Sequence, residues 1–233
     1  MNKKLKIAIY ILVGLIVVYQ LLNFTKILAF YTVPTTGNEP NIKHGSFIIA
    51  SNLITPKRGD FITYEFQDPM YGKSTMTHRL CAMENDTLEI RNGTLFINGK
   101  NVDATYNLKH AYILSEEKFN SLDETVTGKD YMIIPNEGKQ GYLTYIEDKD
   151  AEKLQLKAYR FLDDKTNSDP KIKEIYQNDW NKNHFGPLII PEGKIFVLGD
   201  NRDYSQDSRS YGLIDQEAIT GVLWKTLFVI ESN

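Results

Sequence analysis

The segment GDNRDYSQDSRSYG at residues 199–212 is the most informative stretch of the chain, and it follows directly on the apolar run IFVL at residues 195–198. It gathers three aspartates, two arginines and three serines in one short loop. Carboxylates beside arginines form charge-assisted, often bidentate pairs that hold a loop rigid. Gly, Asp, Asn and Ser also dominate ordinary turns, so composition alone leaves open both a rigid site loop and a polar surface turn.

The order and spacing of these residues favour the site loop. The segment resembles, without a gap, the last signature box of the type I signal peptidases, the membrane-anchored serine endopeptidases of family S26. The resemblance extends over most of the chain outside residues 104–180. It implies an antiparallel β core tethered to the outer face of the cytoplasmic membrane, which cleaves secretory signal peptides after small residues.

The stretch VPTTGNEPNI resembles the family's first box, which reads Pro-Ser-Gly-Ser-Met, one residue, Pro. Pro34 and Pro40 keep the separation of the two prolines. Counting between them places Thr35 at the first serine, Thr36 at the glycine and Gly37 at the nucleophilic serine. The nucleophile position therefore carries no hydroxyl.

The base position is also changed. The family has Lys-Arg in its second box, where this chain has His78-Arg79 in the stretch THRLCA. In the family a neutral, buried lysine takes the proton of the nucleophile. Histidine stands at this position in the endoplasmic-reticulum and archaeal branch, and it is a competent base near neutral pH.

Three interpretations follow from these two replacements. The chain has lost peptidase activity and acts as a signal-peptide-binding or regulatory paralogue, or Thr36 serves as nucleophile with His78 as base. One residue along an extended segment reverses the side-chain direction, which counts against Thr36. The third interpretation takes a nucleophile from elsewhere, such as Ser46 or Ser208.

The resemblance also assigns supporting roles around the base. Thr35 takes the place of a hydroxyl that helps to form the oxyanion hole, and the backbone N–H of Gly37 is the other donor. Ser205 matches the serine that orients the base. Such donors commonly contribute a few kcal/mol to stabilising the transition state.

The charged residues of the loop receive roles in the same way. Asp207 and Arg209 match the paired residues beside the catalytic dyad, and Asp200 and Arg202 match structural residues. Either Asp207 or Asp203 could orient a histidine base. The residues at these positions would also be present in a loop that only keeps its shape.

The N-terminal segment predicts a membrane anchor. Lys3, Lys4 and Lys6 precede an apolar run at residues 7–24, which as a helix would span about 27 Å, close to the thickness of the bilayer core. The lysine excess predicts residues 1–6 in the cytoplasm and the chain after about residue 25 on the outer face. A cleavable signal peptide has a similar start, but no small-residue cleavage site follows this run.

We therefore predict a mainly β protein, with a signal-peptidase-like antiparallel core, an α+β insertion and one N-terminal transmembrane helix. The core is expected in two parts, at residues 25–103 and 185–233, separated by an insertion or cap subdomain at residues 104–184. The insertion is more charged and less periodic than the sequence on either side. In it, Ser115 is expected to cap a helix, and the apolar residues from Ala151 to Phe161 share one helical face.

The most secure local prediction is a β-hairpin within residues 87–102. The sequence alternates with period two on both sides of Asn92-Gly93, a dipeptide suited to a type I′ turn in which both central residues have positive φ. Asn98-Gly99 predicts a second turn directly afterwards.

Composition excludes several other classes. With 27 basic and 30 acidic residues the net charge is −3, so nothing indicates a nucleic-acid partner. Cys81 is the single cysteine, which excludes an internal disulfide and a multi-cysteine zinc site. The four histidines lack metal-ligand spacing, and we expect no metal or other cofactor. The expected partners are the lipid bilayer and the signal peptides of exported preproteins.

Overall fold

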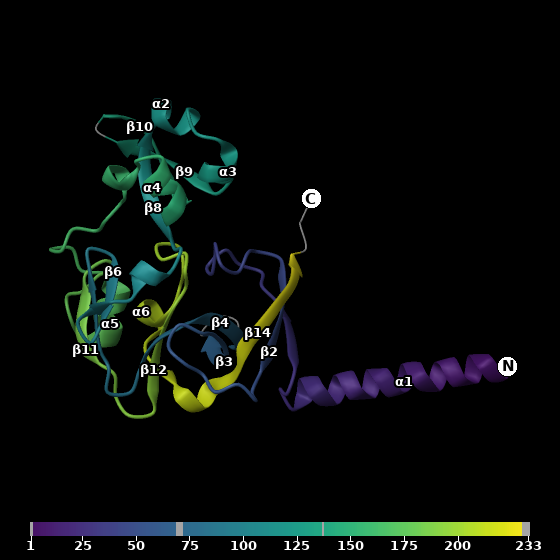
Figure 1. Ribbon diagram of the computed structural model, residues 1–233. Coiled ribbons are helices and arrows are strands. Elements are labelled where there is room, and N and C mark those ends of the chain that lie inside the picture. Colours follow the sequence, from purple (N-terminus) through teal and green to yellow (C-terminus); the bar gives the residue numbers. More distant parts are fainter. Residues whose placement is uncertain (1, 69–71, 137, 230–233) are drawn as a thin grey trace.

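A computed structural model describes residues 2–68, 72–136 and 138–229 (Figure 1). The strands are β1 (Ala29–Thr32), β2 (Ser46–Ser51), β3 (Phe61–Asp68), β4 (Gly72–Met83), β5 (Thr87–Arg91), β6 (Thr94–Ile97), β7 (Lys100–Asn101), β8 (Lys109–Ser115), β9 (Tyr131–Asn136), β10 (Lys139–Glu147), β11 (Phe185–Ile189), β12 (Lys194–Leu198), β13 (Ile214–Asp215) and β14 (Ile219–Val229). The helices are α1 (Lys3–Phe24), α2 (Glu116–Asn120), α3 (Glu124–Thr127), α4 (Asp148–Lys153), α5 (Pro170–Tyr176) and α6 (Ser208–Tyr211), with 3-10 turns η1 (Asp103–Thr105), η2 (Lys157–Tyr159) and η3 (Gln216–Ala218).

The strands form three sheets in which neighbouring strands are antiparallel. The largest has seven strands in the order β1-β2-β14-β3-β4-β12-β13, and a four-stranded sheet has the order β11-β5-β6-β7. A three-stranded sheet, β8-β10-β9, lies with α2, α3 and α4 at one end of the molecule (Figure 1). The prediction of a mainly β, antiparallel fold is confirmed.

The predicted hairpin is confirmed in detail. β5 and β6 pair from Leu88↔Ile97 to Arg91↔Thr94. Asn92 and Gly93 have φ values of 47° and 69°, as a type I′ turn requires. The next turn, at Asn98-Gly99, leads into β7 as predicted.

The main hydrophobic core lies between the four-stranded sheet and strands β4 and β12. Phe185 of β11 is at its centre and is 1% exposed. Its ring lies 4.7 Å from Trp180, 4.9 Å from Tyr176 and 5.5 Å from Phe196, measured between centroids. Ile172 of α5 belongs to the same cluster. The segment that includes α5 therefore packs directly on the β core.

The insertion contains a sheet and short helices, and its limits at residues 104–184 stay a prediction. Ser115 caps α2 as expected, because its side chain accepts a hydrogen bond from the backbone N–H of Lys118. The single helical face expected from Ala151 to Phe161 is wrong. The chain instead turns after α4, where Gln155 has a φ of 56°, and continues as the 3-10 turn η2.

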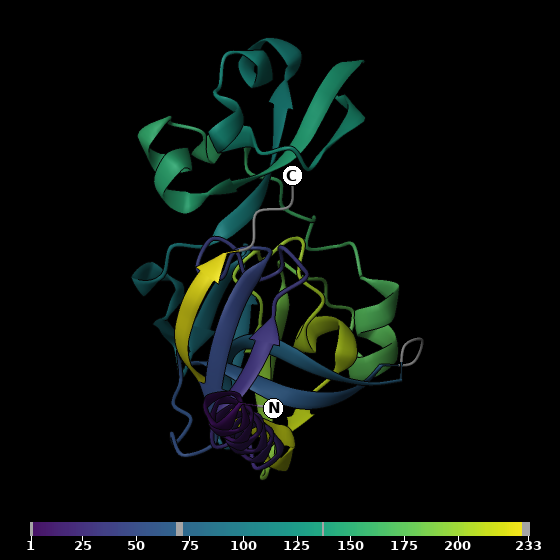
Figure 2. The same cartoon turned by 90° about the vertical axis from the view of Figure 1, so that its right-hand side faces the viewer.

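Helix α1 leaves the body of the protein as a straight, isolated rod, seen end-on in Figure 2 beside β1, β2 and β14. None of its residues is buried, and its mean hydropathy over an 18-residue window is 2.3. Within the described part of the chain it is the one helix long and apolar enough to cross a membrane.

The aromatic cluster around Phe185 generates a test of the core. Phe185→Ala removes a fully buried ring and is expected to lower the free energy of unfolding by about 3–5 kcal/mol. Phe185→Leu retains most of the apolar contact and should cost less. Denaturant unfolding of the full chain in detergent, followed by tryptophan fluorescence, measures both, since Trp180 packs on the deleted ring.

Leu53→Ala is the matched control. This leucine is 75% exposed, so its removal should change the free energy by no more than about 0.5 kcal/mol. A loss below about 1 kcal/mol for Phe185→Ala would contradict the assignment of this ring to the core.

Candidate active site

The loop that contains Gly37 is fixed to two other segments of the chain. The backbone N–H of Asn201 donates to the carbonyl oxygen of Gly37 at 3.0 Å, and its side-chain amide donates to that of Thr36 at 3.3 Å. On the other side, the Asn38 amide donates to the carbonyl oxygen of Thr77 at 2.7 Å. The loop therefore joins the turn after β12 to the strand β4.

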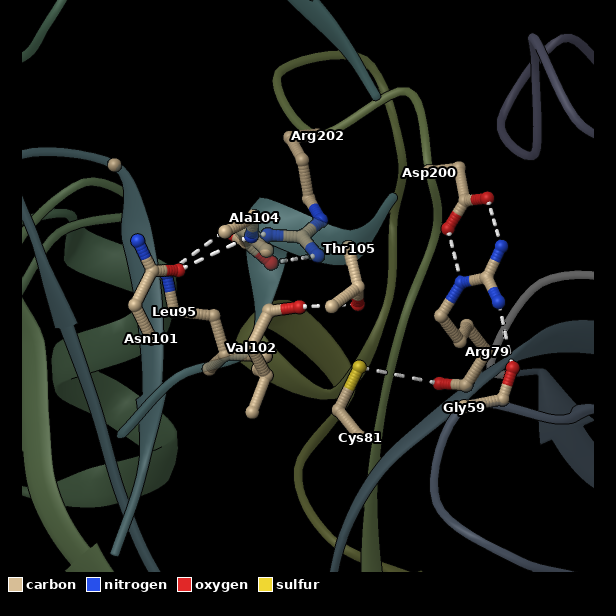
Figure 3. A network of polar contacts seen from close by, with 12 residues as sticks. Gly59, Arg79, Cys81, Leu95, Asn101, Val102, Ala104, Thr105, Asp200 and Arg202 are labelled. Carbon is tan, nitrogen blue, oxygen red and sulfur yellow. Dashed lines mark hydrogen bonds and ion pairs between the residues drawn. The ribbon is translucent and has the colours of Figure 1, made fainter. Parts of the chain in front are cut away.

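A buried ion pair connects the same two elements directly. The Arg79 guanidinium on β4 binds both carboxylate oxygens of Asp200, with Nε at 2.7 Å from Oδ1 (Figure 3). The planar guanidinium also lies between the rings of Phe61 and Tyr106, at 4.2 and 4.1 Å from their centroids. Burial alone would lower the pKa of Arg79, but Asp200 raises it, so the side chain stays charged.

Gly37 is buried, and the position of its absent side chain faces other polar groups. A Cβ built on it would lie 3.6 Å from Ser205 Oγ and 3.8 Å from Thr35 Oγ1, which are ordinary van der Waals distances. Gly37 has no positive φ, so a side chain at this position meets neither a clash nor backbone strain. A side chain that carries a hydroxyl would therefore fit at position 37.

His78 lies in the same site and is 5% exposed. Its Nε2 is 3.4 Å from Ser205 Oγ, and its Nδ1 is 2.8 Å from Tyr64 Oη. Burial is the largest influence on this imidazole and lowers its pKa from the ordinary value of 6.5. A neutral ring with one nitrogen facing a hydroxyl is the state that a general base requires.

The nearby carboxylates do not orient His78 by a hydrogen bond. Asp207 binds the Arg209 guanidinium at 2.8 and 2.9 Å, and it accepts the Gly199 backbone N–H at 3.1 Å. Burial raises the pKa of Asp207, but Arg209 and His78 bring it below its usual range. Asp203 accepts instead from the backbone N–H of Ala111 on β8.

A second buried pair holds the start of the loop. Both oxygens of Asp103 bind the Arg202 guanidinium, at 2.6 and 2.7 Å. The Arg202 side chain is 4% exposed. The loop after β12 is therefore bound to β4 through Asp200 and to the turn η1 through Arg202. Figure 3 shows Arg202 together with the ion pair of Arg79 and Asp200.

The structure does not bring the other predicted hydroxyls to His78. Ser46 Oγ is buried with no hydrogen-bond partner among the described residues. Ser208 Oγ accepts the backbone N–H of Val197 at 3.0 Å. Within the described ranges, the hydrogen bonds of the His78 ring go to Tyr64 and Ser205, so Thr36 makes none with it.

Tyr64 is the site residue that the sequence did not indicate. β3 and β4 pair in a register that sets Ile62 opposite His78 and Tyr64 opposite Met76. Tyr64 and His78 are thus diagonal neighbours on one face of the sheet, within reach of an aromatic side chain. The alternating side-chain directions of a strand at residues 58–66 predict which face of the sheet Tyr64 lies on, but only the pairing register of β3 and β4 places it beside His78.

Comparison with known proteins adds a family match to this geometry. The family described as "Signal peptidase, peptidase S26" matches residues 4–227. Signal peptidase I of Aquifex aeolicus (strain VF5) is 28% identical over 206 residues, which cover 82% of this chain and 72% of that protein. Signal peptidase IB of Staphylococcus aureus is 29% identical over 201 residues, with 82% and 73% covered.

Among solved structures, a signal peptidase I from Enterococcus faecalis V583 is 23% identical, and the match covers 73% of this chain and 97% of that one. The TM-score is 0.34. The family assignment therefore rests on the sequence matches.

The buried imidazole generates a prediction about pH. The pKa of His78 is lower in the folded protein than the 6.5 of the free group, so below pH 6.5 the unfolded chain binds more protons than the folded one. Stability therefore falls as the pH drops through 6.5 toward the folded-state pKa, by up to about 1.4 kcal/mol per pH unit.

Thermal unfolding of the full chain at pH 7.5 and pH 5.5 measures this effect. The melting temperature should fall more between these values for the unmodified chain than for His78→Gln, which cannot take up the proton. The other histidines contribute equally to both proteins. An equal pH dependence in the two would show that His78 does not titrate with the stated sign.

Proposed function

This chain belongs to the signal peptidase family S26, and on that premise we propose that it recognises the signal peptides of exported preproteins at the membrane surface without cleaving them through the family's usual Ser-Lys pair. The observation that carries the proposal is Gly37. The residue stands where the family has its nucleophilic serine, in a loop whose contacts to Asn201 and Thr77 hold it against the base position.

The retained contacts support recognition of a substrate by this site. The ion pairs of Asp200 with Arg79 and of Asp207 with Arg209 are both buried, so they hold the loop in one position. Leaving one partner of such a buried pair unpaired would cost about 3–5 kcal/mol, so these pairs keep the loop in the arrangement that sets the Gly37 segment beside His78. His78 replaces the lysine and has no hydroxyl at Gly37 to activate.

An extended peptide has a backbone edge available beside His78. β12 pairs with β4 only from Arg79 to Met83. The preceding part of β4 pairs with β3 on one side, and among the described strands its other edge has no partner. A peptide that adds as a strand along this edge would run past the space over Gly37, and addition of a strand is a common mode of peptide recognition.

Helix α1 and the family membership together indicate a single-pass membrane protein. We assign the N-terminus to the cytoplasm because Lys3, Lys4 and Lys6 precede the apolar run. The β domain then lies on the outer face, where signal peptides emerge during export. We assign residues 104–184 to an insertion above the site, in which Lys109 forms an ion pair with Glu39 of the Gly37 loop at 2.8 Å.

Introducing the family's serine at position 37 and its lysine at position 78 tests whether the rest of the site can still support the family's catalytic pair. We expect the unmodified full chain in detergent to bind a fluorescent synthetic signal peptide, and Gly37→Ser to bind it equally well. The double variant Gly37→Ser/His78→Lys should cleave a preprotein at least about 100-fold faster than Gly37→Ser/His78→Gln, which has the hydroxyl but no base, because a positioned general base contributes at least this factor. Peptide binding is measured by anisotropy and cleavage by gel.

Thr36→Val is the matched control, and it should change neither binding nor cleavage if Thr36 is not a nucleophile. Absence of peptide binding by the unmodified chain would overturn the proposed function. A double variant that binds the peptide but cleaves no faster would show that the scaffold has lost the geometry of the dyad.

A further inference from the structure

The structure holds the hydroxyl of Ser205 in contact with His78, whereas position 37, which aligns with the family's nucleophile, carries no hydroxyl. We propose that Ser205 is a nucleophile activated by His78, so that this site retains a Ser-His acyl-transfer pair in place of the Ser-Lys pair. Ser205 Oγ is 3.4 Å from Nε2 of His78. Nucleophile-to-base contacts are often this loose when no substrate is bound.

Tyr64 supplies the third group, which positions the base. Its hydroxyl oxygen lies 2.8 Å from Nδ1 of His78, on the opposite side of the ring from Ser205. A proton on Nδ1 that is donated to Tyr64 leaves Nε2 free to accept the Ser205 proton. Both His78 and Tyr64 are nearly fully buried, at 5% and 1% exposure, so packing also holds the ring in this orientation.

The charges around the ring favour the proton transfer. His78 is neutral at rest because burial lowers its pKa, and Asp207 acts in the opposite direction. When the imidazole takes up a proton, the Asp207 carboxylate therefore stabilises the new positive charge without a direct hydrogen bond. Arg209 neutralises part of that carboxylate and limits the effect.

Two glycines lie beside the Ser205 side chain. A Cβ on Gly199 would clash with Ser205 Oγ and with the carbonyl oxygen of Gly37, so only glycine lets this serine pack here. A Cβ on Gly37 would lie 3.6 Å from Ser205 Oγ, so the lack of a side chain at this position leaves room for another atom beside the Ser205 hydroxyl. Thr35 Oγ1 faces the same space and can donate to an oxyanion. Ser205 itself is partly exposed.

The reaction follows from these positions. Ser205 Oγ attacks the carbonyl carbon of a peptide bond, the new C–O bond forms, and the hydroxyl proton passes to Nε2 of His78. The C–N bond then breaks, and His78 returns the proton to the leaving amine. A water molecule, deprotonated by the same nitrogen, hydrolyses the ester and restores the serine.

A fluorophosphonate probe tests this assignment on the full chain in detergent. We expect one phosphonyl adduct per chain, which peptide mapping places on Ser205, and a labelling rate that falls at least about 100-fold in Ser205→Ala and in His78→Gln. Ser121→Ala, at an exposed serine of the insertion, should label as the unmodified protein does. The rate should reach half its maximum below pH 6.5, since the pKa of the base is lowered.

Tyr64→Phe tests the positioning role. It should slow labelling and shift the pH profile while leaving the adduct on Ser205. If the unmodified chain forms no adduct, or forms it at another residue, the assignment of Ser205 as the nucleophile is overturned. This outcome does not depend on how any variant folds. Only the substrate class rests on the function proposed above. If the probe labels Ser205 but the chain binds no signal peptide, the proposed function alone is overturned. If the chain binds the peptide but the probe does not label it, the Ser205 assignment alone is overturned.

Discussion

The buried ion pair between Arg79 and Asp200 fixes the relative position of the two segments that make up the site. Arg79 follows His78 on β4, and Asp200 begins the turn that carries Ser205. The pair is bidentate, and the guanidinium is also held between two aromatic rings. A buried pair of this kind contributes little net stability, because desolvation offsets the attraction, yet losing one partner is costly. It therefore acts as a geometric constraint, which sets the distance between a base on a strand and a hydroxyl on a loop.

That constraint explains how the site keeps its shape with glycine at position 37 and histidine at position 78. The Gly37 loop needs no side chain at its centre, because its contacts with Asn201 and Thr77 use the backbone of Gly37 and the amide of Asn38. None of these contacts requires a side chain at position 37. His78 is a flat ring whose two nitrogens reach partners on opposite sides. Tyr64 and Ser205 are those partners.

The sequence predicted those features that depend on local pattern. The Asn92-Gly93 hairpin follows from turn chemistry, and α1 follows from an apolar run of membrane length. The family resemblance identified the loop at residues 199–212 and the replaced positions Gly37 and His78. Tyr64 was not predicted, since its place beside the base depends on strand register across β3 and β4. The helix expected from Ala151 to Phe161 failed because apolar spacing cannot reveal a residue such as Gln155, whose positive φ ends the helix.

The tautomer of His78 is the most direct measure of whether the site is an organised acid-base pair. Long-range ¹H–¹⁵N NMR of the full chain in detergent, with ¹⁵N-labelled histidine and His78→Gln for assignment, distinguishes the two nitrogens of the ring. At pH 7 we predict a neutral His78 with the proton on Nδ1, facing Tyr64, and an unprotonated Nε2 facing Ser205. A proton on Nε2, or a charged imidazole, would contradict the account, because Nε2 would then have no lone pair to accept the proton of Ser205.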